Sequence, residues 1–133
     1  MEERLIKVGI THGDINGIGY EVILKTFSDA RVAELCTPVI YGSSKIAAYH
    51  RKALELPPVN MNIISQAEDA GINRVNIINC VDDETKVELS QSTSIAGEAA
   101  FLALEAAVTD LKRGAVDVLL TAPINKHNIQ NDE

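Results

Sequence analysis

Residues 5–27 read LIKVGITHGDINGIGYEVILKTF, and this stretch decides the fold class. Its first part, residues 5–11, is short and rich in apolar and β-branched residues, which is typical of a buried strand. From Ile18 to Phe27 the apolar residues recur at helical spacing, so we expect a helix there. A glycine-rich loop separates the two. A strand, a loop and a helix in this order predict an α/β protein.

The same alternation continues along the rest of the chain. We expect further strands at residues 37–41, 60–65, 74–80 and 116–121, and helices at residues 45–56 and 94–113. A serine in Gly42-Ser43-Ser44 can cap the first of these helices, and Pro57-Pro58 should end it. Residues 81–92 are polar and are interpreted as a loop with room for one short edge strand. The pattern predicts a mostly parallel sheet covered by helices on both faces.

The helix expected at residues 94–113 is long and rich in alanine. One apolar row along it contains Phe101, Leu104 and Val108, and a second contains Ile95 and Ala99. We interpret these rows as core rather than as a binding surface for a cofactor.

Composition excludes several classes of protein. The 133 residues suit one domain, and 46% of them are hydrophobic, which argues against disorder. The net charge of −7 argues against a nucleic-acid or membrane partner, and no apolar run approaches the ~18 residues of a membrane span. The isolated Cys36 and Cys80 and the acidic start indicate a cytoplasmic protein without disulfides or a secretory signal. His12, His50 and His127 lack the spacing of a zinc site, and we expect them in loops or at the surface.

The first candidate site is THGDINGIGYE, residues 11–21, with glycines at 13, 17 and 19. Glycines allow a backbone to approach a ligand closely, and the start of a helix favours anions. The spacing is neither that of a Rossmann motif nor that of a P-loop. The alternative is a plain turn in which Asp14 or Asn16 caps the following helix. The candidate binding residues in this segment are Asp14, Asn16, Gly17 and Gly19.

The second candidate site is LTAPINK, residues 120–126. Pro123 suits the first position of a new helix, which places Lys126 in its first turn. A lysine there opposes the helix dipole, and a bound anion would offset that cost. Asn125 offers an amide to a hydroxyl or a phosphate. Thr121, Asn125 and Lys126 are therefore candidates for binding substrate or cofactor, and the alternative for Lys126 is a solvated surface lysine.

The same two segments carry a resemblance to a known family. DINGIGYE, residues 14–21, resembles the G-D-P-A-G-I-G-P-E loop of the 4-hydroxythreonine-4-phosphate dehydrogenases of pyridoxal phosphate biosynthesis. Gly97-Glu98 and DVLLTAPINK, residues 117–126, resemble the second signature of that family, which ends in T-A/G-P-I-x-K. The chain departs from the first motif at Ile15, Asn16 and Tyr20, which replace proline, alanine and proline.

This resemblance implies an isocitrate/isopropylmalate-dehydrogenase-like fold with two α/β domains, paired as a homodimer. Residues 1–133 would be the amino-terminal part of the first domain, without the second domain and the carboxy-terminal strands. The last expected helix breaks off at the end of the chain, so we expect a fragment of a longer protein.

The resemblance also implies an activity. Family members use NAD or NADP to oxidise 4-phosphooxy-L-threonine, a phosphorylated hydroxy-amino acid, to a β-keto acid that decarboxylates to 3-amino-2-oxopropyl phosphate. A divalent metal, zinc, magnesium or cobalt, would be bound by histidines outside this chain. No catalytic residue and no metal ligand is expected within residues 1–133. The alternatives are a related dehydrogenase for 4-phospho-threonate or an isopropylmalate-like acid, and a non-catalytic module that binds a phosphorylated metabolite.

Overall fold

The computed structural model describes residues 5–123. Its elements follow one another in the order β1 (Lys7–Thr11), α1 (Gly19–Phe27), α2 (Val32–Leu35), β2 (Thr37–Gly42), α3 (Ser44–Ala53), β3 (Met61–Ile64), η1 (Ala67–Asp69), β4 (Val75–Asn79), α4 (Ser94–Lys112) and β5 (Val118–Thr121). The strands form one sheet in the order β3-β4-β2-β1-β5. Every pairing between neighbouring strands is parallel.

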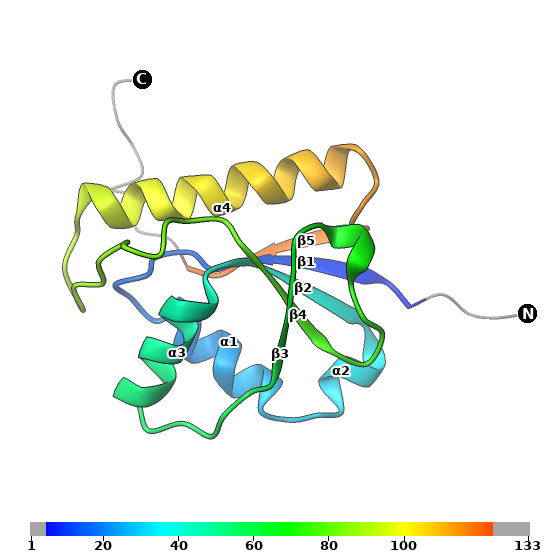
Figure 1. Cartoon of the computed structure of the whole chain (residues 1–133), viewed down its shortest axis with the longest axis horizontal. Coiled ribbons are helices and arrows are strands. Elements are labelled where there is room, and N and C mark those ends of the chain that lie inside the picture. The colour runs from blue at the N-terminus through cyan, green and yellow to red at the C-terminus, as the bar shows by residue number, and fades with distance from the viewer. Residues whose placement is uncertain (1–4, 124–133) are drawn as a thin grey trace, which may run out of the picture.

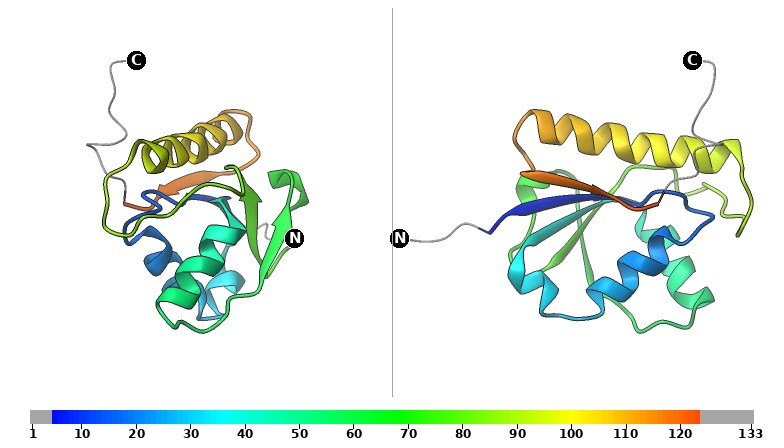
Figure 2. Two further views of the ribbon diagram at one scale, coloured as in Figure 1. Left: turned by 60° about the vertical axis from the view of Figure 1, so that its left-hand side comes forward. Right: turned by 180° about the vertical axis from the view of Figure 1, so that it is seen from behind.

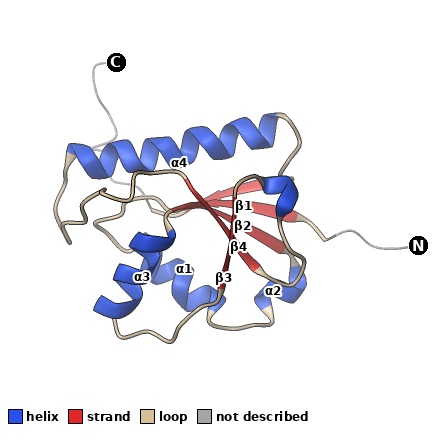
Figure 3. Ribbon diagram, in the orientation of Figure 1, coloured by secondary structure: helices blue, strands red, loops and turns tan. Residues whose placement is uncertain are grey.

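The helices cover both faces of this sheet. Helix α4 crosses one face, and α1, α2 and α3 lie on the other (Figures 1 and 2). Figure 3 shows the strands enclosed between these two layers. The predicted α/β fold with a parallel sheet and helices on both sides is therefore confirmed. None of the helices within residues 5–123 is long and apolar enough to cross a membrane.

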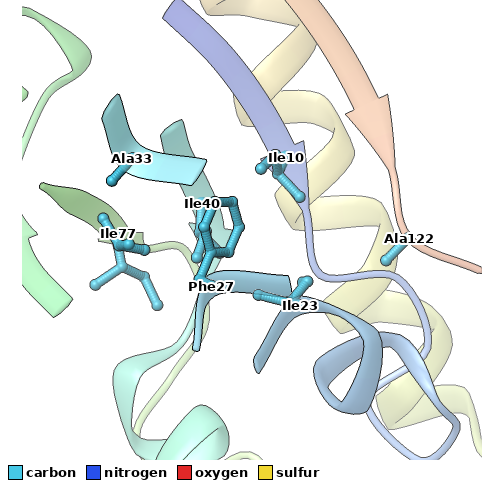
Figure 4. Close-up of a cluster of buried hydrophobic side chains, with 8 residues drawn as sticks. Ile10, Ile23, Phe27, Ala33, Ile40, Ile77 and Ala122 are labelled. Atoms are coloured by element: carbon cyan, nitrogen blue, oxygen red, sulfur yellow. The ribbon is translucent and has the colours of Figure 1, made fainter. Parts of the chain in front are cut away.

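The core between the sheet and α1 is built from branched aliphatic side chains. Ile10, Ile40 and Ile77 come from three neighbouring strands and face Ile23 and Phe27 of α1 (Figure 4). Burying side chains of this size contributes about 1.5–3 kcal/mol each. This packing fixes α1, and with it the loop that precedes α1.

Helix α4 packs on the sheet differently from the expectation. Its buried positions are small residues, Ala96, Gly97, Ala99, Ala100, Ala103 and Ala107. Phe101 and Ile95, which the apolar rows assigned to the core, are exposed. Small side chains let the helix approach the sheet closely, so the alanine row, and not the row of larger residues, faces the sheet.

Helix α3 ends at Ala53 instead of continuing to residue 56. Glu55 has a left-handed backbone with φ of 54°. The N–H of Leu56 donates to Arg51 and that of Glu55 donates to Lys52, which is the Schellman arrangement. The backbone thus ends the helix before the two prolines are reached. The expected serine cap is confirmed, because the side chain of Ser43 accepts a hydrogen bond from the N–H of Ile46.

Candidate functional site

The two candidate segments meet at the carboxyl end of the sheet. Thr11 of β1 pairs with Thr121 of β5 in parallel register. Beyond the strands, the N–H of Asp14 donates to the carbonyl of Pro123 at 2.8 Å. The glycine-rich loop and residues 121–123 therefore form one continuous edge. Asn125 and Lys126 lie outside the described residues.

Gly13 and Gly19 are required by close backbone approaches. Gly13 has φ of +67°, and a Cβ there would lie 2.3 Å from the carbonyl oxygen of Pro123. A Cβ on Gly19 would lie 2.3 Å from the carbonyl oxygen of His12. Gly19 is buried, so its small size serves the internal packing of the loop rather than an approach to a ligand.

Gly17 differs from these two glycines. Its φ is not left-handed, and a Cβ there would meet only the side chain of Asp14, at 3.1 Å. It is half-buried beside the exposed Ile18. Neither a strained backbone nor a nearby main-chain atom demands a glycine at this position, and the N–H of Gly17 donates to the carbonyl of Asp14 at 3.1 Å, so its amide is already paired.

The capping alternative for Asp14 and Asn16 is wrong. The residue that precedes α1 is Ile18, which makes no side-chain capping bond. Asp14 instead accepts a hydrogen bond from the backbone N–H of Asn16 through Oδ1, at 3.0 Å. Asp14 is half-buried, and its Oδ2 lies 3.1 Å from the position that a Cβ on Gly17 would take.

The side chain of Asn16 is buried and already hydrogen-bonded. Its Oδ1 accepts from the N–H of Glu88 at 2.7 Å. Its Nδ2 donates to the carbonyl of Gln91 at 2.9 Å and to Oγ1 of Thr93 at 3.2 Å. Asn16 was predicted to contact a ligand, but its amide is directed to the segment before α4.

Two histidines, His12 and His50, are buried beside the glycine-rich loop. The expectation of surface or loop histidines is met for His12, which lies in the loop after β1, and is wrong for His50, which lies in α3. They are 0% and 2% exposed. Nε2 of His12 lies 2.9 Å from the carbonyl of Ala99, and Nε2 of His50 lies 2.7 Å from the carbonyl of Ile15. A carbonyl can only accept, so both Nε2 atoms carry a proton. His127 lies outside the described residues.

The tautomer of His12 determines the direction of its second hydrogen bond. With the proton on Nε2, Nδ1 is an acceptor, and the hydroxyl of Tyr20 donates to it at 2.8 Å. The same hydroxyl accepts from the N–H of Ser43 at 2.8 Å. Burial lowers the pKa of both His12 and His50 below the ordinary value, which keeps both rings neutral.

A groove of about 460 Å³ lies on the α4 side of the sheet, and no described residue of either candidate segment lines it. Tyr41 donates to Asp110 there at 2.6 Å, and Arg113 forms ion pairs with Asp110 and Glu68. Burial raises the pKa of Cys80 in the groove to about 11, so its thiol is protonated at neutral pH. These contacts join α4 to η1 and β2.

Residues 5–123 contain no group of three or more His, Cys, Asp or Glu side chains placed to bind a metal ion. The ring nitrogens that carry protons in His12 and His50 already donate to backbone carbonyls. The described residues do not fit a metal, so no step through a metal is assigned to them.

The family model for pyridoxal phosphate biosynthetic protein PdxA matches residues 34–133. The chain belongs to the PdxA family. The match includes the second candidate segment and begins after the glycine-rich loop, whose sequence departs from the family motif at Ile15, Asn16 and Tyr20.

Relatives of known sequence extend the similarity to the whole chain. The 4-hydroxythreonine-4-phosphate dehydrogenase of Bacteroides thetaiotaomicron is 59% identical over 133 residues, which are 100% of this chain and 36% of that protein. The D-threonate 4-phosphate dehydrogenase of Cupriavidus necator is 31% identical over 129 residues, which cover 95% of this chain and 38% of that protein.

A solved structure gives the same fold for this PdxA-family chain. The crystal structure of a 4-hydroxythreonine-4-phosphate dehydrogenase from Burkholderia phymatum matches with a TM-score of 0.83 and 28% identity, covering 96% of this chain and 39% of that one. The chain therefore spans between 36% and 39% of the length of these relatives.

Proposed function

We propose that the full-length protein is an NAD- or NADP-dependent 4-hydroxythreonine-4-phosphate dehydrogenase. It would oxidise the C3 hydroxyl of 4-phosphooxy-L-threonine to a β-keto acid, which loses carbon dioxide to give 3-amino-2-oxopropyl phosphate. The observation that carries the proposal is the 59% identity, across the whole chain, to the Bacteroides thetaiotaomicron dehydrogenase of that name. The identity to the Cupriavidus necator D-threonate 4-phosphate dehydrogenase is lower, at 31%.

This chain would contribute the edge of the site at the ends of β1 and β5. The substrate and a nicotinamide cofactor both carry anionic groups, and backbone amides before a helix suit such groups. The glycine-rich loop reaches this edge through the hydrogen bond from Asp14 to Pro123, and Thr121 is exposed at the end of β5. Asn125 and Lys126 would add an amide and a positive charge. We infer that this edge binds a phosphate or carboxylate.

The rest of the site would come from outside residues 1–133. The nicotinamide accepts the hydride when it is bound, and a divalent metal, zinc, magnesium or cobalt, would be held by histidines elsewhere in the protein. Residues 1–133 would form the amino-terminal part of the first of two α/β domains, in a cytoplasmic homodimer. Neither nucleic acid nor membrane is a proposed partner.

The substrate is tested by a direct comparison. Purified full-length protein is supplied with a divalent metal, NAD or NADP, and either 4-phosphooxy-L-threonine or D-threonate 4-phosphate, and the absorbance of the reduced cofactor is followed. We expect the higher kcat/KM with 4-phosphooxy-L-threonine. A preference for D-threonate 4-phosphate would assign the second activity instead, and binding without any reduced cofactor would indicate a non-catalytic binding module.

The role of the edge is tested with Lys126→Met. Removing a charge-assisted hydrogen bond should weaken substrate binding by about 1.5–3 kcal/mol. Lys52→Met is the matched control, because Lys52 is an exposed lysine in the last turn of α3. Equal affinity of the Lys126→Met variant and the parent in a calorimetric titration would leave Lys126 as a surface lysine.

A further inference from the structure

The glycine-rich loop is attached to the segment before α4 mainly through Asn16. In addition to its three side-chain hydrogen bonds to Glu88, Gln91 and Thr93, its backbone carbonyl accepts from the N–H of Ser90 at 2.8 Å. The partners lie 72 to 77 residues away in the sequence for the side-chain bonds. One buried residue thus fixes two stretches of loop to each other.

The attachment continues into α4. Thr93, which receives a hydrogen bond from Asn16, is the residue that caps α4, and its Oγ1 accepts from the N–H of Ala96 at 3.1 Å. The first turns of α4 contain Gly97 and Glu98. Asn16 also directly precedes Gly17, the half-buried glycine of the loop. The position of the Gly17 backbone is therefore tied to the start of α4.

We propose that Asn16 is a positioning residue that holds the glycine-rich loop against the segment before α4, in the arrangement that the substrate or cofactor site at this edge requires. The kinetic part of this inference rests on the proposed function. Asn16 is 2% exposed and its amide is directed inward, so it acts through the loop rather than by touching the ligand. Its identity matters because a side-chain amide combines an acceptor oxygen for Glu88 with two N–H donors for Gln91 and Thr93.

The chain offers a matched control in Asn76. This asparagine is 0% exposed, and its Nδ2 donates to the carbonyls of Pro38, Gly71 and Arg74. Those partners precede or begin their strands, at the amino end of the sheet, whereas the glycine-rich loop lies at the carboxyl end. Asn76→Ala therefore removes a comparable buried network far from the proposed site.

The experiment compares Asn16→Ala and Asn76→Ala in the full-length protein, under conditions in which circular dichroism shows both variants folded. We expect Asn16→Ala to raise KM for 4-phosphooxy-L-threonine or the nicotinamide cofactor roughly tenfold, equivalent to about 1.4 kcal/mol, with kcat within about twofold of the parent. Asn76→Ala should leave both constants unchanged. An unchanged KM in Asn16→Ala, or an equal rise in Asn76→Ala, would overturn the proposal.

A second pair of variants guards against a folding defect in Asn16→Ala. Thr93→Val removes the hydroxyl that links Asn16 to α4, and Thr93→Ser keeps it. We expect Thr93→Val to raise KM in the same direction and Thr93→Ser to restore the value of the parent. If serine fails to restore KM, the linkage through Oγ1 is not what positions the loop.

Hydrogen exchange makes the inference independent of activity. We expect the amides of residues 13–19 and 88–93 to exchange faster in Asn16→Ala than in the parent or in Asn76→Ala, because losing the side-chain hydrogen bonds of Asn16 permits local opening. If the parent shows no dehydrogenase activity, the proposed function fails while this measurement still decides the role of Asn16. Unchanged exchange in these segments would rule that role out.

Discussion

The hydroxyl of Tyr20 lies 2.8 Å from Nδ1 of His12, in the interior directly beside the glycine-rich loop. Gly42, at the end of β2, makes room for this contact, because a Cβ there would lie 2.4 Å from the Tyr20 oxygen. His12 is anchored in turn to Ala99 of α4, and Tyr20 to Ser43 before α3. The pair thus connects β1, α1, α3 and α4 at the edge where the candidate site lies.

We predict that Tyr20→Phe destabilises the protein. The change leaves the N–H of Ser43 and Nδ1 of His12 without a partner in the interior. Stranding a buried polar group costs about 1–3 kcal/mol of unfolding free energy. Tyr49→Phe, at an exposed tyrosine of α3, should change it by less than about 0.5 kcal/mol. Chemical denaturation of the two variants decides, and equal stabilities would mean that the His12–Tyr20 bond contributes nothing.

The buried histidines predict a pH dependence of stability. His12 and His50 have a pKa lowered by burial in the folded protein, while the unfolded chain has the ordinary value near 6.5. Below that value the unfolded state binds more protons, so the unfolding free energy should fall as the pH drops. The slope reaches at most about 1.4 kcal/mol per pH unit for each histidine.

Denaturation at roughly pH 8, 6.5 and 5.5 measures this slope in the parent and in His50→Gln, because most carboxylates titrate below this range. Glutamine can still donate to the carbonyl of Ile15, which His50 reaches at 2.7 Å. It does not titrate, so the variant should lose less stability on acidification than the parent. Identical slopes would show that His50 is not one of the groups responsible.

The sequence could predict the sheet because its signals are local. The spacing of apolar residues marks each strand and helix within a few residues of its observed ends, and parallel strands bring the ends of β1 and β5 to one edge. That geometry places residues 11–21 and 120–123 at the same end of the sheet, but their contact also requires β1 and β5 to be neighbours, which the sequence did not predict. The single turn of α2 (Val32–Leu35) was missed, because four residues are too few for a helical period.

The contacts that hold the loop could not be predicted in the same way. His12 reaches Ala99 across 87 residues, and Asn16 reaches Glu88 across 72. Such pairings depend on how the layers come together, which periodicity does not encode. His50 is an exception, because it lies four residues after the buried Ile46 on one face of α3, and that spacing could have indicated its burial.

The two glycines before and at the start of α1 should respond differently to substitution. Gly19→Ala places a Cβ 2.3 Å from the carbonyl oxygen of His12, so the backbone must shift, and we expect a loss of about 1–3 kcal/mol of unfolding free energy. Gly17→Ala meets only the Asp14 side chain, at 3.1 Å, and should leave stability nearly unchanged. Gly17→Ala should raise KM without a loss of stability if the ligand lies against this glycine.

Denaturation and steady-state kinetics on both variants of the full-length protein separate these effects. The expected pattern is a stable Gly17→Ala protein with impaired binding and an unstable Gly19→Ala protein. A Gly17→Ala variant with the stability and KM of the parent would show that Gly17 has no role in binding.

Residues 1–133 produced alone should associate through β5. This strand is the last in the sheet order, and Val118 and Leu120 are exposed on it. They stand in register with Val8 and Ile10, so they extend the face of the sheet that packs against α1, beyond the helices that the structure describes. An unpaired strand edge with apolar side chains is a template for association.

Size-exclusion chromatography with light scattering should therefore give a mass above that of a monomer, and the double variant Val118→Lys, Leu120→Lys should shift it toward the monomer, because lysines on an edge strand oppose pairing. Ile72→Lys is the control, since Ile72 is also exposed but lies in the turn before β4.

The same preparation should form no reduced cofactor from 4-phosphooxy-L-threonine, because hydride transfer needs an oriented substrate and a group that takes its proton. A monomeric parent would contradict the association through β5, and turnover by these residues alone would require a catalytic group among side chains assigned here to binding or packing.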